Sequence, residues 1–409
     1  MASRRRWLYG LTANVVLLGV VSLFTDFSSE MILPILPFFI VQVLGGSAFI
    51  VGVIEGSADS VVAFMKVFSG FFSDRARRRK WFVAAGYGVS TVMKVLFPFA
   101  PSWPEFWGMR IVERTGKGVR DAPRDALITE STPAETRGKA FGFHRTMDTA
   151  GAIIGPLVAL ALLTWYLTGD TEGAAYRLII LVAALPAVAS FSLVFLLKEP
   201  ARETGAGRTL RITLRGIPRP LTQFIAIAAL FSFADFSYAF LLLRVTDIGQ
   251  TTSSAILLYV LFNVVYAAHA LPAGILSDRM GRKPVILTGY VCFVAMAILL
   301  AWTPHVFTLI LGFALYGLSY GMAEGTQRAL VADIAPPESK ATVLGAYHTS
   351  TGVVKLASGL AAGALWTLVA PAATFWFGAI VAGIAALALF LWKAPAMSGA
   401  SGRAPPRPA

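Results

Sequence analysis

Apolar residues along the chain form long runs, whereas a soluble protein alternates apolar and polar positions over shorter distances. Three runs, at residues 178–197, 285–303 and 374–392, contain no charged residue. Each has about the twenty residues that a helix needs to cross ~30 Å of hydrocarbon. Inside lipid every backbone polar group needs an internal partner, so repeated runs of this length predict a helical membrane bundle. The short alternating segments of a β-barrel do not stand out.

The whole pattern predicts about twelve spans, which one long polar connection divides into six and six. We expect a first six-helix bundle over residues 1–199, a cytoplasmic linker over 200–217 and a second six-helix bundle over 218–393. A Pro/Gly/Ser-rich cytoplasmic tail at 394–409 is expected to be disordered. The predicted spans are 8–41, 47–73, 81–100, 104–130, 137–166, 176–198, 218–246, 253–278, 283–303, 305–333, 339–368 and 372–393.

The two halves of the chain resemble each other. The stretch "ALITESTPAETRGKAFG" from Ala126 pairs with "ALVADIAPPESKATVLG" from Ala329, and "GFFSDRARRRK" from Gly70 pairs with "GILSDRMGRKP" from Gly274. "DFSS" from Asp26 pairs with "DFSY" from Asp235. The similar spacing indicates a duplicated six-helix unit, and parallel repeats of this kind place a solute site between the halves near mid-membrane.

The repeat identifies a fourth span that hydropathy would miss. Residues 113–125, "ERTGKGVRDAPRD", superficially resemble a glycine-rich nucleotide loop, but Lys117 is followed by Gly118 where a P-loop needs Ser or Thr. Residues 102–130 align with the apolar residues 305–333, so the charged stretch belongs to a membrane helix. At 3.6 residues per turn, five of its positions fall within an arc of ~80°. They are Arg110, Arg114, Lys117, Asp121 and Arg124, with Glu113 and Asp125 at the edges.

Charges facing lipid would cost several kcal/mol each, so this row of charges should face other helices or a water-filled cavity. It is either a structural ion-pair seam or part of a site for solute and ions. Further candidates for the charged or solute-binding surface are His144, Arg145, Asp235, Glu324 and Lys355.

Buried carboxylates beside bases suit proton coupling, because a conformational change can alter their protonation. The candidates are Asp26, Glu30, Glu55, Asp59 and Asp148. Permanent salt bridges to the bases of the fourth span are the competing assignment. Asn263 stands where the repeat would place a second Asp59, so we expect the ion-coupling charge mainly in the first half.

The net charge of +13 reflects topology and does not indicate nucleic-acid binding. Basic residues cluster in segments 4–6, 75–80, 198–219 and 279–283, at one end of the spans, whereas the turns at 45–48, 101–105 and 303–305 carry no Lys or Arg. The positive-inside bias places the basic segments and both termini in the cytoplasm. The single cysteine and four scattered histidines suggest no metal, no cofactor and no enzyme chemistry.

"GILSDRMGRKP" resembles the signature loop of the major facilitator superfamily, G-x-L-[AS]-D-[RK]-x-G-R-[RK], and the earlier copy has Arg77 where glycine is usual. The resemblance implies the major facilitator fold: twelve transmembrane helices as two six-helix repeats. It also implies that the paired loops gate the conformational change, with Asp74 and Asp278 capping helices. The gating residues carried over are Gly70, Asp74, Arg75, Arg78, Gly274, Asp278, Arg279 and Arg282.

In the predicted fifth span, Gly151, Gly155 and Pro156 resemble the antiporter motif of exporters in this superfamily. Ordinary small-residue packing is the alternative. The fourth-span family pattern R-x-x-x-G-x-G is not met in register: Val112 stands at the arginine position, with Arg110 and Arg114 on either side.

The sequence therefore predicts an all-α secondary active transporter in a bacterial cytoplasmic membrane, by preference a proton-coupled antiporter that exports a small organic solute. Its partners would be the solute, protons and the lipid bilayer, and a monomer is plausible. The alternatives are an uptake symporter for an anionic metabolite and a non-transporting membrane receptor or regulator.

Overall fold

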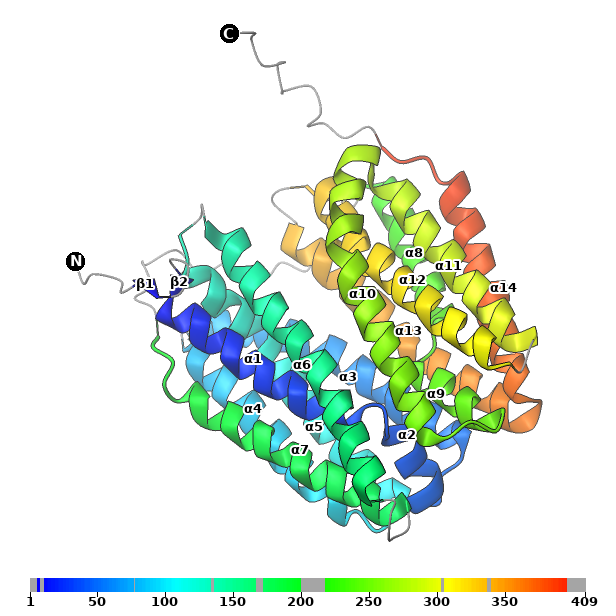
Figure 1. Cartoon of the computed structure of the whole chain (residues 1–409). Helices are drawn as coiled ribbons and strands as arrows, with labels where there is room; N and C mark the ends of the chain where they lie inside the picture. The colour runs from blue at the N-terminus through cyan, green and yellow to red at the C-terminus, as the bar shows by residue number, and fades with distance from the viewer. Residues whose placement is uncertain are drawn as a thin grey trace, which may run out of the picture.

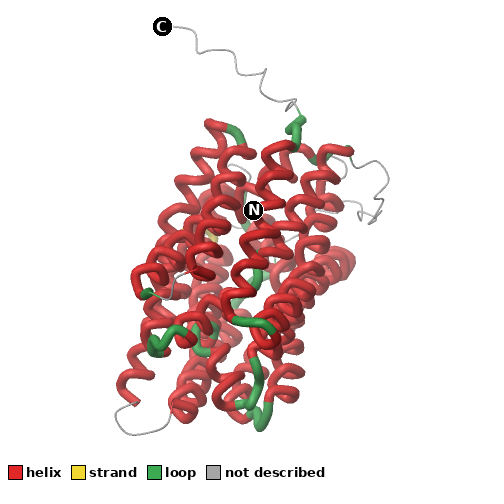
Figure 2. The backbone as a smooth tube through the Cα atoms, turned by 90° about the vertical axis from the view of Figure 1, so that its right-hand side faces the viewer, coloured by secondary structure: helices red, strands yellow, loops and turns green. Residues whose placement is uncertain are grey.

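The computed structural model describes residues 6–7, 11–76, 78–133, 136–166, 172–199, 218–302, 305–336 and 340–395. Two helical bundles lie side by side (Figure 1), and Figure 2 shows the helices roughly alongside one another with short connections. A two-residue antiparallel pairing of β1 (Arg6–Trp7) with β2 (Leu11–Thr12) precedes the first bundle. The predicted linker 200–217 and most of the tail, 396–409, lie outside the described residues.

The first bundle contains six long helices. They are α1 (Ala13–Ile32), α3 (Ala48–Ala76), α4 (Arg79–Leu96), α5 (Trp103–Glu130), α6 (Arg137–Tyr166) and α7 (Glu172–Val194). The second contains α8 (Arg219–Ala234), α9 (Tyr238–Asp247), α10 (Thr252–Met280), α11 (Arg282–Trp302), α12 (Val306–Ile334), α13 (Lys340–Leu368) and α14 (Pro371–Leu391).

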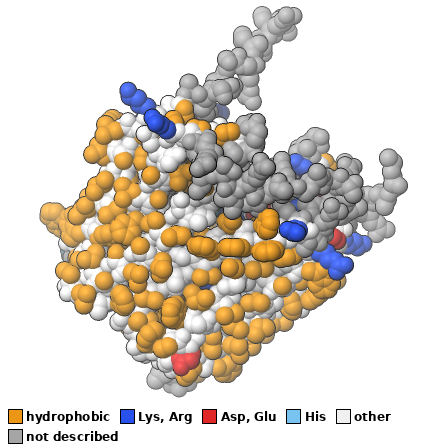
Figure 3. Space-filling view, turned by 180° about the vertical axis from the view of Figure 1, so that it is seen from behind, with side chains coloured by type: hydrophobic (Ala, Val, Ile, Leu, Met, Phe, Trp, Pro, Cys, Tyr) orange, Lys and Arg blue, Asp and Glu red, His pale blue; other side chains and the backbone are white. Residues whose placement is uncertain are grey.

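Within the described ranges, 11 helical spans are long and apolar enough to cross a membrane, and α8 and α9 together count as one of them. Helix α5 is not among them because of its charges, yet it is a continuous helix of 28 residues. With α5 included, the count agrees with the predicted twelve-span architecture. Figure 3 shows hydrophobic side chains covering most of the outer face, with Lys and Arg near its upper margin.

Two predicted spans are interrupted. The first, predicted at 8–41, ends as a regular helix at Ile32 and continues as the short helix α2 (Leu36–Phe38) and a π-helical turn, Phe39–Val43. Pro34 and Pro37 explain the interruption because each lacks the N–H that an interior helical residue donates. The seventh, predicted as one helix at 218–246, breaks between Ala234 and Tyr238.

We call the end of the bundles that carries residues 75–80 and 279–283 the basic end, and the other the closed end. At the closed end α3 crosses α13 with the backbones in contact. A Cβ added at Gly56 would lie 2.9 Å from the carbonyl oxygen of Lys355, and one added at Gly363 would lie 2.8 Å from the Cα atom of Phe49. Gly52 and Gly359 face each other still more closely. Glycine is needed here because any side chain would separate the two helices.

Candidate functional site

A cavity with two adjoining chambers, of about 330 and 640 Å³, lies between the bundles. Lys66, Lys117, Tyr320, Glu324 and Arg328 line both chambers. The larger chamber is also lined by Gly274, Ser277 and Arg282, so the cavity extends toward the basic end. Because the two halves touch at the closed end, the cavity in this conformation is open toward the basic end.

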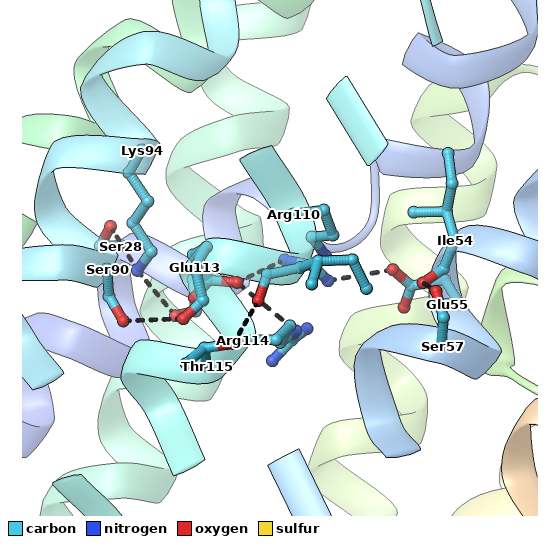
Figure 4. Close-up of polar contacts among 12 residues, drawn as sticks. Ser28, Ile54, Glu55, Ser57, Ser90, Lys94, Arg110, Glu113, Arg114 and Thr115 are labelled. Atoms are coloured by element: carbon cyan, nitrogen blue, oxygen red, sulfur yellow. Dashed lines mark hydrogen bonds and ion pairs between the residues drawn. The ribbon is translucent and has the colours of Figure 1, made fainter. Parts of the chain in front are cut away.

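The charged row of α5 faces inward. Val112, where the family pattern would place arginine, is exposed on the outer surface, whereas Arg110, Glu113 and Arg114 are buried. Arg110 lies between two carboxylates, 3.0 Å from Glu55 of α3 and 3.2 Å from Glu113 (Figure 4). Arg114 Nε lies 3.5 Å from the same Glu113 oxygen and its side chain lines the smaller chamber. The near-complete burial of this ion cluster makes each of its charges depend on the others.

The remaining charges of the row follow the larger chamber. Asp121 lies 3.8 Å from both Lys66 and Arg124, and Arg124 lies 3.0 Å from Asp125. Lys117 lines both chambers and, among the described residues, makes no direct ion pair or hydrogen bond. The row therefore contains both alternatives left open by the sequence, a buried ionic seam at one end and charges facing a cavity at the other.

The five proton-coupling candidates have different surroundings. Asp59 lines the smaller chamber and Asp26 the larger, and neither has an ion-pair partner within the described ranges. Glu30 accepts a hydrogen bond of 2.8 Å from the Tyr259 hydroxyl across the interface. Glu55 accepts one of 3.4 Å from Tyr238.

Asp148 has local partners on α1 and α6. It accepts a short hydrogen bond from the Ser22 hydroxyl and lies 3.4 Å from Nδ1 of His144. His144 is itself buried. These contacts make Asp148 the most fully satisfied of the candidate carboxylates that reach the cavity.

The break in the seventh span brings together charged groups of the second half. Lys355 of α13 donates to both the backbone oxygen and the carboxylate of Asp235, each at 2.5 Å. Tyr320 donates to the same carboxylate at 3.0 Å. One turn after Tyr320 on α12, Glu324 pairs with Arg328 and accepts a hydrogen bond of 2.9 Å from Tyr266. Arg145 of the first half reaches across to the Tyr266 hydroxyl.

The signature loops lie at the basic end. In the second half Gly281 adopts φ +93°, a conformation that favours glycine. Arg282 pairs with Asp278 at 2.5 Å and with Asp333 at 2.9 Å, and Arg279 is exposed.

In the first copy Arg75 and Arg78 are exposed, and Gly70 has room for a Cβ 3.5 Å from Ala122. The side chain of Asp74 and residue Arg77 lie outside the described residues. The predicted gating role of these loops stays a prediction.

The small residues of the fifth span pack against the first. A Cβ at Gly151 would lie 2.6 Å from the carbonyl oxygen of Leu23, and one at Gly155 would lie 2.7 Å from that of Phe27. These contacts bring α6 against the turn of α1 that carries Asp26 and Glu30. Pro156 is inside α6.

Two buried cations were missed from the sequence. Lys94 of α4 donates to Ser28 at 3.0 Å and Ser29 at 2.8 Å on α1, and Arg120 donates to Ser90 at 3.0 Å with its guanidinium 4.4 Å from the ring centre of Tyr87. A lone lysine inside an otherwise apolar span was the available signal for Lys94. Within the described ranges, no group of three or more His, Cys, Asp or Glu side chains is placed to hold a metal ion.

Comparison with known proteins places this geometry in a family. The sequence model of the Major Facilitator Superfamily matches residues 18–245 and 224–409. The chain is 39% identical over 385 residues to the uncharacterised MFS-type transporter MJ1317 of Methanocaldococcus jannaschii, covering 93% of this chain and 94% of that protein. It is 24% identical to the multidrug resistance protein MdtH of Cronobacter sakazakii, covering 77% of each.

A crystal structure of the nucleoside transporter NupG has the same fold, with a TM-score of 0.74 and 14% identity, over 93% of this chain and 98% of that one. Members of this family are transporters rather than enzymes, sit in the lipid bilayer and bind small-molecule solutes. The paired six-helix units, the cavity between them and the matches across both halves lead to one conclusion: this chain belongs to the major facilitator superfamily and is a multi-pass membrane transporter of that family.

Proposed function

We propose that the protein is a proton-coupled antiporter that exports a small organic solute by alternating access, with its basic end in the cytoplasm of a bacterial cell. The observation that carries the proposal is the position of Asp26 and Asp59. Both line the cavity, and neither has an ion-pair partner among the described residues. A carboxylate in this setting can hold either a proton or the polar group of a solute, and competition between the two is the basis of exchange.

The packing of α6 against α1 supports this choice. Gly151 and Gly155 hold α6 against the segment that carries Asp26, so a movement of either helix changes the surroundings of that carboxylate. The relative MdtH is named a multidrug resistance protein, which is consistent with efflux.

An uptake symporter for an anionic metabolite is the second candidate. Lys66, Arg114 and Lys117 line the smaller chamber, and Lys117 has no direct partner among the described residues. If these bases bind an anion, protonation of nearby Asp59 would strengthen the binding, and solute and proton would move together.

Purified protein in liposomes under an imposed pH gradient separates the candidates. An antiporter accumulates solute when the interior is acidic, because protons leave as solute enters, and a symporter accumulates it when the interior is alkaline. We expect accumulation with an acidic interior, abolished in Asp59→Asn, with Asp247→Asn at the exposed closed end as the matched control. Equal accumulation without a gradient would contradict proton coupling, and binding without flux would favour a receptor.

A further inference from the structure

The two walls of the cavity differ in how their charges are satisfied. On the second-half wall each acid has a base as partner: Asp235 has Lys355 at 2.5 Å, and Glu324 has Arg328. A solute meets these as neutral pairs. Breaking either pair would expose an uncompensated charge in a confined space, so this wall is a poor source of free binding charge.

The first-half wall carries charges of both signs that are not in direct pairs. Asp26, Asp59 and Lys117 make no ion pair within the described part of the chain, although Lys117 lies within electrostatic range of both acids. Among the described residues, Arg114 has one ion-pair contact, at 3.5 Å to Glu113, and it shares that carboxylate with Arg110. The side chains of Asp59 and Lys117 are accessible from the smaller chamber.

The arrangement places positive and negative groups around one space. Lys117 lies at the junction of the two chambers, with Asp59 and Arg114 lining the smaller and Asp26 the larger. Phe231, Tyr320 and Tyr347 supply ring surface on the opposite wall of the smaller chamber. Its volume of about 330 Å³ is at the lower end of the roughly 300–1,000 Å³ range of small-molecule pockets.

We propose that the solute is a small zwitterion with an apolar side group: its anionic group binds Lys117 and Arg114, its cationic group binds Asp59, and its side group packs on the aromatic wall. A solute with one charge satisfies one sign and leaves the other without a partner when the cavity closes around it. A zwitterion satisfies both.

This inference rests on the proposed antiport and explains its exchange step. The cationic group of the solute and a proton neutralise the same carboxylate, Asp59, so each weakens the binding of the other. The solute binds from the basic side with the acids ionised, and protonation at the other side releases it. No net charge is added to the cavity in the loaded state, which lowers the cost of closing it.

The test is binding to the purified full-length protein, followed by its thermal unfolding in detergent. The probes share one ring and one chain length: phenylalanine is the zwitterion, phenethylamine the cation, hydrocinnamate the anion and hydrocinnamamide the neutral compound. The dipeptide phenylalanylalanine extends the set. We expect the zwitterions to bind at least about tenfold more tightly than either singly charged compound, the loss expected for one charge-assisted contact.

Two variants assign the charges. Lys117→Met should weaken zwitterion and anion binding but not cation binding, whereas Asp59→Asn should weaken zwitterion and cation binding but not anion binding. Asp247→Asn, an exposed acid outside the cavity, is the control. If a variant fails to fold, the comparison of compounds on the unmodified protein still decides.

Tighter binding of a singly charged or neutral compound overturns the inference, as does the absence of binding by both zwitterions. Preference for the anion would support the uptake symporter instead. Gradient-driven flux is measured separately. Loss of the zwitterion preference would reject this inference and leave proton coupling intact. Flux that does not depend on the gradient, with zwitterion binding intact, would reject the antiport alone.

Discussion

The crossing of α3 and α13 at the closed end provides a direct test of alternating access. In Gly56→Ala, the new methyl group would lie 2.9 Å from the carbonyl oxygen of Lys355, 3.2 Å from the Cα atom of Leu356 and 3.3 Å from its carbonyl oxygen. All three neighbours are backbone atoms, so no side-chain rotation relieves the overlap. The helices must separate by a few tenths of an ångström, or the closed end must open.

The cost of such overpacking is ~1–3 kcal/mol in a well-packed interface. It acts on the conformation in which these backbones touch and is relieved when they part. The population with the closed end open should therefore rise roughly 5- to 150-fold relative to the unmodified protein.

The assay is labelling of Ser60→Cys by a membrane-impermeant maleimide added from the closed side, in a Cys292→Ala background. Ser60 hydrogen-bonds across the same interface to the carbonyl oxygen of Gly352 at 2.7 Å, so its labelling reports separation of the helices. Gly345→Ala, on α13 with nothing within 4 Å of the added methyl, is the matched control. Equal labelling rates for the two variants would refute the reasoning.

Three further predictions concern the buried charges and the loops. Glu55→Gln should lower stability in thermal unfolding by up to ~3–5 kcal/mol, because Arg110 loses a buried partner at 3.0 Å. Asp247→Asn, where the more exposed acid pairs with Arg244, should cost under ~1 kcal/mol. Equal losses in the two variants would show that burial does not govern the cost of breaking an ion pair. Tyr259→Phe should increase closed-side labelling of Ser60→Cys by about tenfold or more, because it removes the hydrogen bond to Glu30 across the interface. A hydrogen bond to a charged group contributes ~1.5–3 kcal/mol. Tyr87→Phe, within the first bundle, should leave the labelling unchanged. Gly281→Ala should lower the free energy of unfolding by ~1–3 kcal/mol because of its φ of +93°. Gly274→Ala, with open space around its Cβ position, should leave it nearly unchanged. A loss of stability in Gly274→Ala but not in Gly281→Ala would contradict the backbone argument.

Most of the architecture could be predicted from the sequence, because the length and hydropathy of apolar runs identify membrane helices. The repeat added what hydropathy lacked: α5 was recognised through its alignment with the apolar residues 305–333. The interruption after Ile32 was not predicted, although Pro34 and Pro37 account for it within the predicted span 8–41.

The break at Asp235 could not be predicted in the same way. No proline or glycine marks it, and the repeat partner Asp26 lies in the continuous helix α1. The break depends on tertiary contacts, above all the Lys355 ammonium that binds the backbone oxygen of Asp235. The ion pairs could not be predicted either. Helical spacing placed Glu113, Arg114 and Lys117 on nearby faces, but only the packed bundles show that Glu113 is paired and that Lys117 has no ion-pair partner within the described ranges.

The break between α8 and α9 makes the seventh span two rods joined by a three-residue hinge. Helix α9 contributes Tyr238 to the closed end, whereas α8 stays packed within its own bundle. A tilt of the ten residues of α9 can therefore break the hydrogen bond between Tyr238 and Glu55 without moving the rest of the bundle. The hinge lies where the Lys355 ammonium binds the backbone oxygen of Asp235. A change that breaks this contact would therefore also weaken the contact of α9 with Glu55.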